Sequence, residues 1–129
     1  MEFLGQEPIE KIEDILSGHL IDSGVNTAAV IDLAGHIIAN CNSDEYHVDI
    51  YPLAALAAGN YSAVDEMARL VGEDEFSLLF HKGKDQNLHF CKINHDLLLM
   101  TTFDSDLQLG ALRLKIGESV RKIRECWPT

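Results

Sequence analysis

The sequence predicts a single α+β domain in which helices cover an antiparallel sheet. Short β-branched and apolar runs separated by turn residues predict five strands, and three longer segments with helical periodicity surround them. The chain has 129 residues, 47% of them apolar, which suits one domain with its own core. No repeat or linker divides it. The predicted order is helix, two strands, helix, three strands and helix, which is typical of α+β layers.

The first predicted helix covers residues 8–22. Pro8 fits the first turn of a helix, and Gly24 lies just beyond its end. The apolar residues recur at helical spacing and predict one buried stripe: Ile9, Ile12, Leu16 and Leu20.

A β-hairpin is predicted next, over residues 27–40. The turn is Asp32-Leu33-Ala34-Gly35, in which Asp and Gly occupy positions that turns favour. Two β-branched residues stand on each side of it: Val30 and Ile31 before, Ile37 and Ile38 after. A hairpin so close to the N-terminus indicates an antiparallel sheet.

The second helix is predicted over residues 49–71, where Gly72 ends it. Its apolar surface is wider than one buried face, because two stripes run side by side. The first contains Ile50, Leu53, Ala57, Tyr61, Val64, Ala68 and Val71, and the second contains Leu56, Ala63, Met67 and Leu70. Either the helix is sunk in the core of a monomer, or the second stripe forms a subunit interface. A domain this small has little room for the first arrangement, so we favour the second.

Three further strands are predicted over residues 76–82, 88–93 and 97–103, joined by polar turns as a meander. The last of them, LLLMTTF, is apolar almost throughout and is expected in the middle of the sheet. A final helix follows, with one apolar stripe that contains Leu109, Leu112, Ile116, Val120, Ile123 and Trp127.

Charge and composition narrow the classes of partner. Ten Lys and Arg against 21 Asp and Glu give a formal net charge of -11, whereas nucleic acids and anionic membranes attract positive surfaces. No apolar run reaches the roughly 18 residues of a membrane-spanning helix, and the N-terminus lacks the pattern of a secretory signal. The three cysteines have no CxxC spacing, which fits a reducing compartment. We expect a cytoplasmic protein with no nucleic-acid partner and no membrane insertion.

Three segments, taken with the order of elements, resemble the roadblock/dynein light chain family. They are the hairpin TAAVIDLAGHIIAN, the Ala-rich run LAALAA at 53–58, and the ending from LLLM at 97–100 through Asp104 to LGALR at 109–113. The resemblance covers nearly the whole chain and is closest to the stand-alone prokaryotic members, similar to the mutual gliding protein B regulators of polarity. It implies the roadblock (profilin-like) fold, a five-stranded antiparallel sheet with the first and third helices on one face and the second helix on the other.

The resemblance also implies a function. Family members dimerise through the second helix and the third strand, here residues 49–71 and 76–82, and serve as adaptors or regulators of Ras-like small GTPases. We therefore predict a non-catalytic homodimer that binds such a GTPase and activates its hydrolysis or scaffolds it, with a heterodimer left open. No catalytic, cofactor or metal residue is assigned. The predicted dimer residues are Leu53, Leu56, Tyr61, Val64, Met67, Phe76, Leu78 and Phe80.

An alternative prediction is a small cytoplasmic sensor. His89 and Cys91 fall on one face of a predicted strand, and His81 and Met100 would join them to line a cleft for a ligand or metal. The pattern contains no CxxC or HxxxH pair, and a one-residue shift in register would separate His81 from His89. Structural or surface histidines are therefore the preferred interpretation. The motifs GxxxxGK[ST], GxSxG, HExxH and GxGxxG do not occur, so hydrolase and kinase functions lose their usual support.

Overall fold

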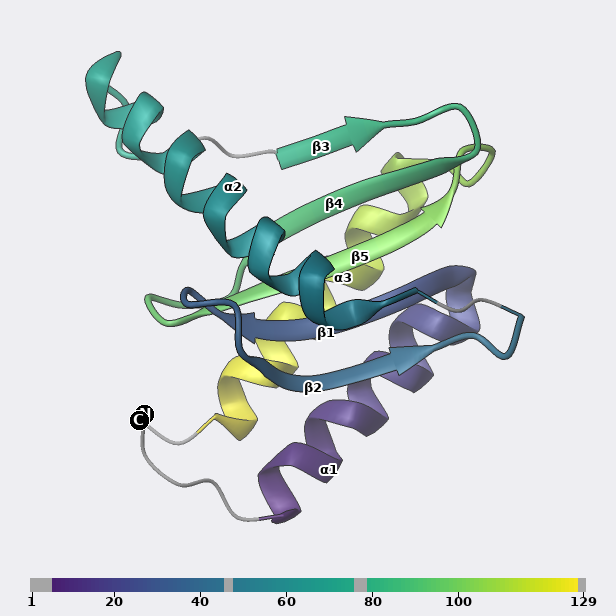
Figure 1. Cartoon of the computed structure of the whole chain (residues 1–129). Coiled ribbons are helices and arrows are strands. Elements are labelled where there is room, and N and C mark those ends of the chain that lie inside the picture. Colours follow the sequence, from purple (N-terminus) through teal and green to yellow (C-terminus); the bar gives the residue numbers. More distant parts are fainter. Residues whose placement is uncertain (1–5, 46–47, 76–78, 128–129) are drawn as a thin grey trace.

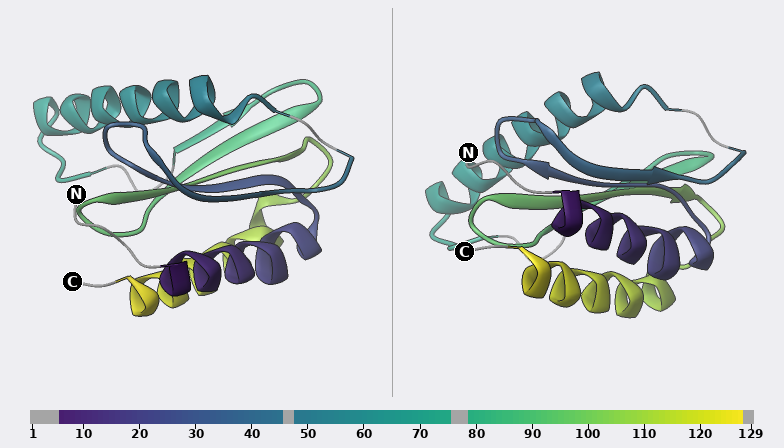
Figure 2. Two further views of the ribbon diagram at one scale, coloured as in Figure 1. Left: turned by 60° about the horizontal axis from the view of Figure 1, so that its bottom comes forward. Right: turned by 90° about the horizontal axis from the view of Figure 1, so that it is seen from below.

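The computed structural model describes residues 6–45, 48–75 and 79–127, and in these residues a five-stranded antiparallel sheet has the order β2-β1-β5-β4-β3. The elements are α1 (Gln6–Ile15), β1 (Val25–Asp32), β2 (Ile37–Asn42), α2 (Ile50–Leu70), β3 (Leu79–Lys82), β4 (Gln86–Lys92), β5 (Leu97–Asp104) and α3 (Leu109–Cys126). Helices α1 and α3 cover one face of the sheet, and α2 covers the other (Figures 1 and 2). The predicted fold class and order of elements are confirmed.

The first helix changes its pitch before it ends. Beyond Ile15 the chain continues as a π-helical turn, η1 (Leu16–Leu20), and a 3-10 turn, η2 (Ile21–Ser23). The buried residues Ile12, Leu16 and Leu20 repeat every four positions, which exceeds the 3.6 residues of an α-helical turn. The wider π turn keeps these side chains on one side of the helix, toward the sheet.

Two apolar cores lie on either side of the sheet. The larger one joins the sheet to α1 and α3 and includes Phe103 of β5 and Ile116 and Ile123 of α3. The smaller one lies under α2 and includes Ala54 and Ala57 of the helix and Met100 of β5. The strand β5 contributes to both cores, and Leu97 to Phe103 are all buried. This agrees with the prediction of an interior strand, because β5 lies between β1 and β4.

The β1–β2 turn is shaped by Asp32 and by the passage of α2 above it. One carboxylate oxygen of Asp32 accepts hydrogen bonds from the backbone N–H groups of Ala34 and His36, at 3.0 and 2.8 Å. Gly35 has a φ of +92°, and a Cβ added there would lie 2.9 Å from the Cα of Ala55 in α2. The turn therefore needs glycine both for its backbone conformation and for the close approach of the helix.

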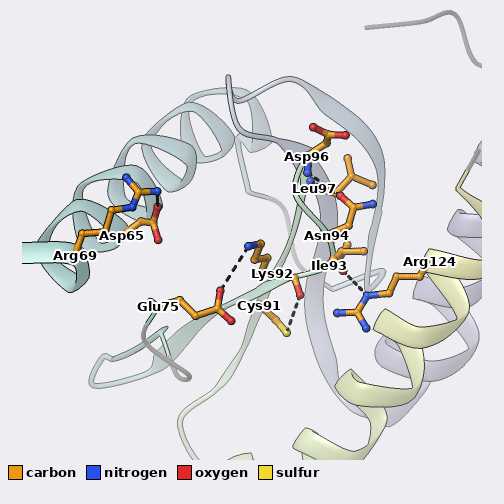
Figure 3. A network of polar contacts seen from close by, with 10 residues as sticks. All are labelled: Asp65, Arg69, Glu75, Cys91, Lys92, Ile93, Asn94, Asp96, Leu97 and Arg124. Carbon is orange, nitrogen blue, oxygen red and sulfur yellow. Dashed lines mark hydrogen bonds and ion pairs between the residues drawn. The ribbon is translucent and has the colours of Figure 1, made fainter. Parts of the chain in front are cut away.

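The β4–β5 hairpin is held by polar contacts at its turn (Figure 3). The Asn94 side-chain oxygen accepts hydrogen bonds from the N–H groups of Asp96 and Leu97, at 2.8 and 2.9 Å. Arg124 of α3 donates through Nε to the carbonyl of Ile93. The hairpin is thus tied to the end of the last helix, which fixes the long strands relative to α3.

Candidate interaction surface on helix α2

Helix α2 packs against the sheet with small side chains and leaves large apolar side chains outside. Ile50, Ala54, Ala57, Ala58 and Ala68 are buried. Leu56, Met67 and Leu70 are 72%, 52% and 81% exposed. These three residues lie on one side of the helix at 100° per residue, with the exposed Ala63 among them. We call Leu56, Ala63, Met67 and Leu70 the outer stripe. The two-faced helix predicted from the sequence is confirmed.

The predicted dimer residues fall into three groups. Leu56 and Met67 belong to the outer stripe, whereas Leu53 and Tyr61 are half-buried and pack against the core under α2, and Val64 is half-buried as well. Phe80 packs against the opposite core and stacks on Phe103, with ring centroids 6.2 Å apart. Phe76 and Leu78 lie outside the described residues. Leu70 is absent from the predicted dimer residues, although it shares the second predicted stripe and is the most exposed large apolar residue in the described part of the chain.

Polar contacts border the outer stripe on both sides. On one side Arg69 pairs with Asp65 at 2.7 Å, as Figure 3 shows, and with Glu66 at 3.0 Å. On the other side Asn60 of α2 contacts the ring of His81 in β3, with 3.4 Å between Oδ1 and Nε2. β3 is an edge strand that pairs only with β4 among the described residues. The outer stripe and an open strand edge therefore lie on neighbouring parts of one surface.

The alternative of a His/Cys-lined sensor cleft is wrong, because the four side chains lie on two faces of the sheet. The register pairs His81 with Leu88 and Phe80 with His89. His81 therefore contacts Phe90 on the α2 side, where Met100 is also buried, while His89 and Cys91 point to the α1 and α3 side. Across residues 6–45, 48–75 and 79–127 no group of three or more His, Cys, Asp or Glu is placed to hold a metal ion.

Four side chains that are wholly or partly buried are held in their neutral forms. Burial, with a smaller contribution from Arg113, lowers the pKa of His89 to about 4. Burial raises the pKa of the Cys41 and Cys91 thiols and of the Tyr61 hydroxyl. A buried thiol with a raised pKa is a poor nucleophile, so Cys41 and Cys91 behave as small packing residues.

In the part of the chain that the structure describes, no helix combines the length and apolarity that a membrane span requires.

The model of the Roadblock/LC7 domain family matches residues 11–103. This match covers well over half of the chain, and the chain therefore belongs to the Roadblock/LC7 domain family. Comparison with the curated proteins yields no match.

Solved structures of MglB proteins resemble this chain over nearly their whole length. The gliding protein MglB from Thermus thermophilus is 26% identical with a TM-score of 0.86, over 96% of this chain and 93% of that chain. Myxococcus xanthus MglB is 25% identical with a TM-score of 0.87, over 100% and 98%. An MglB with a tetrameric arrangement is 26% identical with a TM-score of 0.86, over 96% of each chain. The resemblance to the mutual gliding protein B group is confirmed.

The fold also resembles profilin. Profilin II from Acanthamoeba castellanii is 15% identical with a TM-score of 0.62, over 89% of this chain and 98% of that chain. At this identity the likeness concerns the fold alone, and it confirms the profilin-like architecture.

Proposed function

We propose that this chain is a non-catalytic, homodimeric regulator or adaptor that binds a Ras-like small GTPase in the cytoplasm and modulates its nucleotide state. The observation that carries the proposal is the outer stripe, where Leu56, Met67 and Leu70 stay exposed on a helix whose other face is already packed. Single exposed leucines are ordinary, but large apolar residues gathered on one helix mark a protein-binding surface.

A second copy of the chain is the proposed occupant of the outer stripe. The stripe lies beside β3, which ends the sheet, so a two-fold axis there would bring helix to helix and strand edge to strand edge. A tetrameric arrangement is recorded for one MglB that this chain resembles. We propose Leu56, Met67 and Leu70 as direct contacts, with Leu53, Tyr61 and Val64 supporting them from beneath. Phe76 and Leu78 stay predictions.

The GTPase partner is proposed from family membership and the likeness to MglB. The sequence carries no phosphate-binding loop motif, so the nucleotide is assigned to the partner. In this scheme the dimer provides a surface that binds the GTPase. Binding either activates GTP hydrolysis or holds the GTPase in a larger assembly, as in the polarity regulators that the chain resembles.

The test is a pull-down from native lysate with the full chain as bait, in the presence of GDP or a non-hydrolysable GTP analogue. We expect one small GTPase to be enriched in a nucleotide-dependent way, and its hydrolysis rate is then measured with and without the chain. In the same assay Leu56→Asp tests the outer stripe, and Leu114→Asp is its control for an added surface charge, because Leu114 is an exposed leucine of α3 outside the outer stripe. Recovery of no GTPase with either nucleotide would contradict the proposal.

A further inference from the structure

β2 forms the edge of the sheet opposite β3 (Figure 1). A groove of about 470 Å³ runs along this free edge of β2. Ile9 and Glu13 of α1 form one wall, Tyr51 of α2 stands at the other, and the segment 35–40 forms the floor. The proposed function uses the β3 edge and does not involve this groove.

The backbone of β2 has unpaired groups at this edge. The N–H of Ser43 donates to the carbonyl of Asn26 at 2.8 Å, and the register continues with Asn42 opposite Thr27 and Asn40 opposite Ala29. Hydrogen-bonded and non-hydrogen-bonded pairs alternate in an antiparallel sheet. The N–H and C=O of Asn40 and Asn42 therefore face away from β1, where the described chain provides no further strand.

The β2 edge also lacks the usual protection against strand addition. Natural edge strands carry Lys or Pro, are very short, or bend away through a bulge. β2 (IIANCN) has no charged residue and no proline, whereas the four-residue β3 ends in Lys82. The register pairs Val30 with Ala39 and Ile31 with Ile37, so the extra residue of the β1–β2 bulge is Ile38 of β2, and the regular, unprotected part of this edge is residues 39–42.

An acidic side chain flanks the groove. Glu13 lines it directly, and the Cys41 thiol of β2 donates to the backbone carbonyl of Glu13, with 3.4 Å between Sγ and O, which places this part of α1 close to β2. The positive side chain of Lys11 pairs with Glu7 at 3.3 Å, and His36 is held by Asp32 at 2.9 Å. An incoming segment would therefore meet the carboxylate of Glu13 on the α1 side of the groove, in a chain with a net charge of -11.

We propose that this groove binds an extended, basic segment of a partner protein, which adds to β2 as a further strand of the sheet. Main-chain hydrogen bonds to Asn40 and Asn42 would supply affinity, and alternate side chains would supply specificity. One set would place Lys or Arg against Glu13 over α1, and the other would place apolar residues beside Ile37 and Tyr51.

The probe is a short labelled peptide of alternating Val and Lys, titrated with the full chain and followed by fluorescence anisotropy. Two matched peptides accompany it: one with Glu in place of Lys, and one N-methylated at alternate amides so that it cannot pair with a strand edge. Three variants of the chain are compared, with their melting curves recorded. Glu13→Lys reverses the charge of the side chain that lines the groove, and Asn40→Pro removes an outward N–H without changing the pairing with β1. Glu118→Lys is the control, because it makes the same charge change on α3.

We expect the Val/Lys peptide to bind in a saturable way and the Glu-containing and N-methylated peptides not to bind. Glu13→Lys and Asn40→Pro should each weaken it about tenfold or more, because each removes a charge-assisted or main-chain contact, while Glu118→Lys should change it less than about twofold. If Asn40→Pro fails to fold, the N-methylated peptide tests the same contact.

Four outcomes would overturn the proposal. The first is that no peptide binds in a saturable way. The second is that Glu13→Lys and Glu118→Lys lose the same affinity for the Val/Lys peptide while the N-methylated peptide binds as tightly as the unmethylated one, because this result indicates diffuse charge attraction. Binding that emerges only after removal of residues 1–5 would make the chain's own N-terminus the occupant. If Asn40→Pro changes the sedimentation of the peptide-free protein, the occupant of the groove is a second copy of the chain.

Discussion

His89 lies directly opposite Thr101 in the pairing of β4 with β5. Within the described residues, neither the His89 Nδ1 nor the Thr101 hydroxyl has a hydrogen-bond partner. His89 is 5% exposed, and its burial, aided by Arg113, lowers its pKa from 6.5 to about 4. The domain therefore holds a neutral imidazole between the sheet and α3, without the polar contacts that would stabilise its protonated form.

The free energy of unfolding should fall as the pH drops from about 6.5 to about 4. The unfolded chain binds the His89 proton more tightly than the native state, so the native state is fully stable with respect to this group above the unfolded pKa and loses stability as the pH approaches the native pKa. The shift corresponds to about 3 kcal/mol. Urea unfolding at several pH values measures it. His89→Leu should flatten the dependence of the unfolding free energy on pH between about 4 and 6.5, while the exposed control His95→Gln should leave this dependence unchanged. An unchanged pH dependence in His89→Leu would assign it to other groups.

Gly35 and Gly72 form a matched pair that separates backbone strain from a steric clash. Both have positive φ, +92° and +86°, but a Cβ at Gly35 would meet Ala55 at 2.9 Å whereas a Cβ at Gly72 would meet nothing within 4 Å. Gly72→Ala should cost about 1 kcal/mol from backbone conformation alone, and Gly35→Ala about 1 to 3 kcal/mol more. Thermal and urea unfolding give both values. Equal losses would show that α2 moves aside at no cost.

The elements and the two-faced α2 were predictable because their signals are local and periodic. The stripe with Leu56 and Met67 follows from helical geometry alone, and β5 follows from a long apolar run between turns. The faces of short strands were not predictable. Phe80 is one of the predicted dimer residues, and the side of the sheet on which it stacks against Phe103 could not be read from the sequence, because a shift of one residue reverses every side chain of a strand. The same shift separates His81 from His89.

Features that are assembled from distant segments of the chain could not be predicted from the sequence either. The β2 groove brings together Ile9, Ile38 and Tyr51 from three elements, and no spacing along the chain marks such a meeting. The π turn at Leu16–Leu20 has a signal in the four-residue repeat of buried positions, but that repeat is also compatible with an ordinary α-helix.

Asp32→Ala should destabilise the domain by about 1 to 2 kcal/mol, because two backbone N–H groups of the turn would lose their acceptor. Burial would raise the pKa of Asp32, but hydrogen bonds from His36 and Ala34 outweigh it, and the pKa is lowered from 3.8. The native state thus binds the proton less tightly than the unfolded state, so this stabilisation is complete above pH 3.8 and is lost as the pH falls below it. Unfolding curves of Asp32→Ala and the acceptor-retaining Asp32→Asn test this. Asp32→Asn should lose less, and equal losses would contradict a role for the carbonyl-type oxygen.

Leu56→Asp should dissociate the proposed dimer, while Leu114→Asp should leave it intact. The two leucines have nearly the same exposure, 72% and 75%, but one lies in the outer stripe of α2 and the other on α3 at the far face of the sheet. A two-fold interface would bring the two introduced carboxylates into a desolvated contact, which should raise the dimer dissociation constant about a hundredfold or more. Sedimentation equilibrium over a range of concentrations gives the constants, with melting curves to show that both variants fold. Met67→Glu should reproduce the effect of Leu56→Asp. A wild-type chain that sediments as a monomer at micromolar concentration would contradict the proposed dimer. Equal dissociation by Leu114→Asp would exclude the outer stripe as the interface, because both substitutions would then act through surface charge rather than through a buried contact.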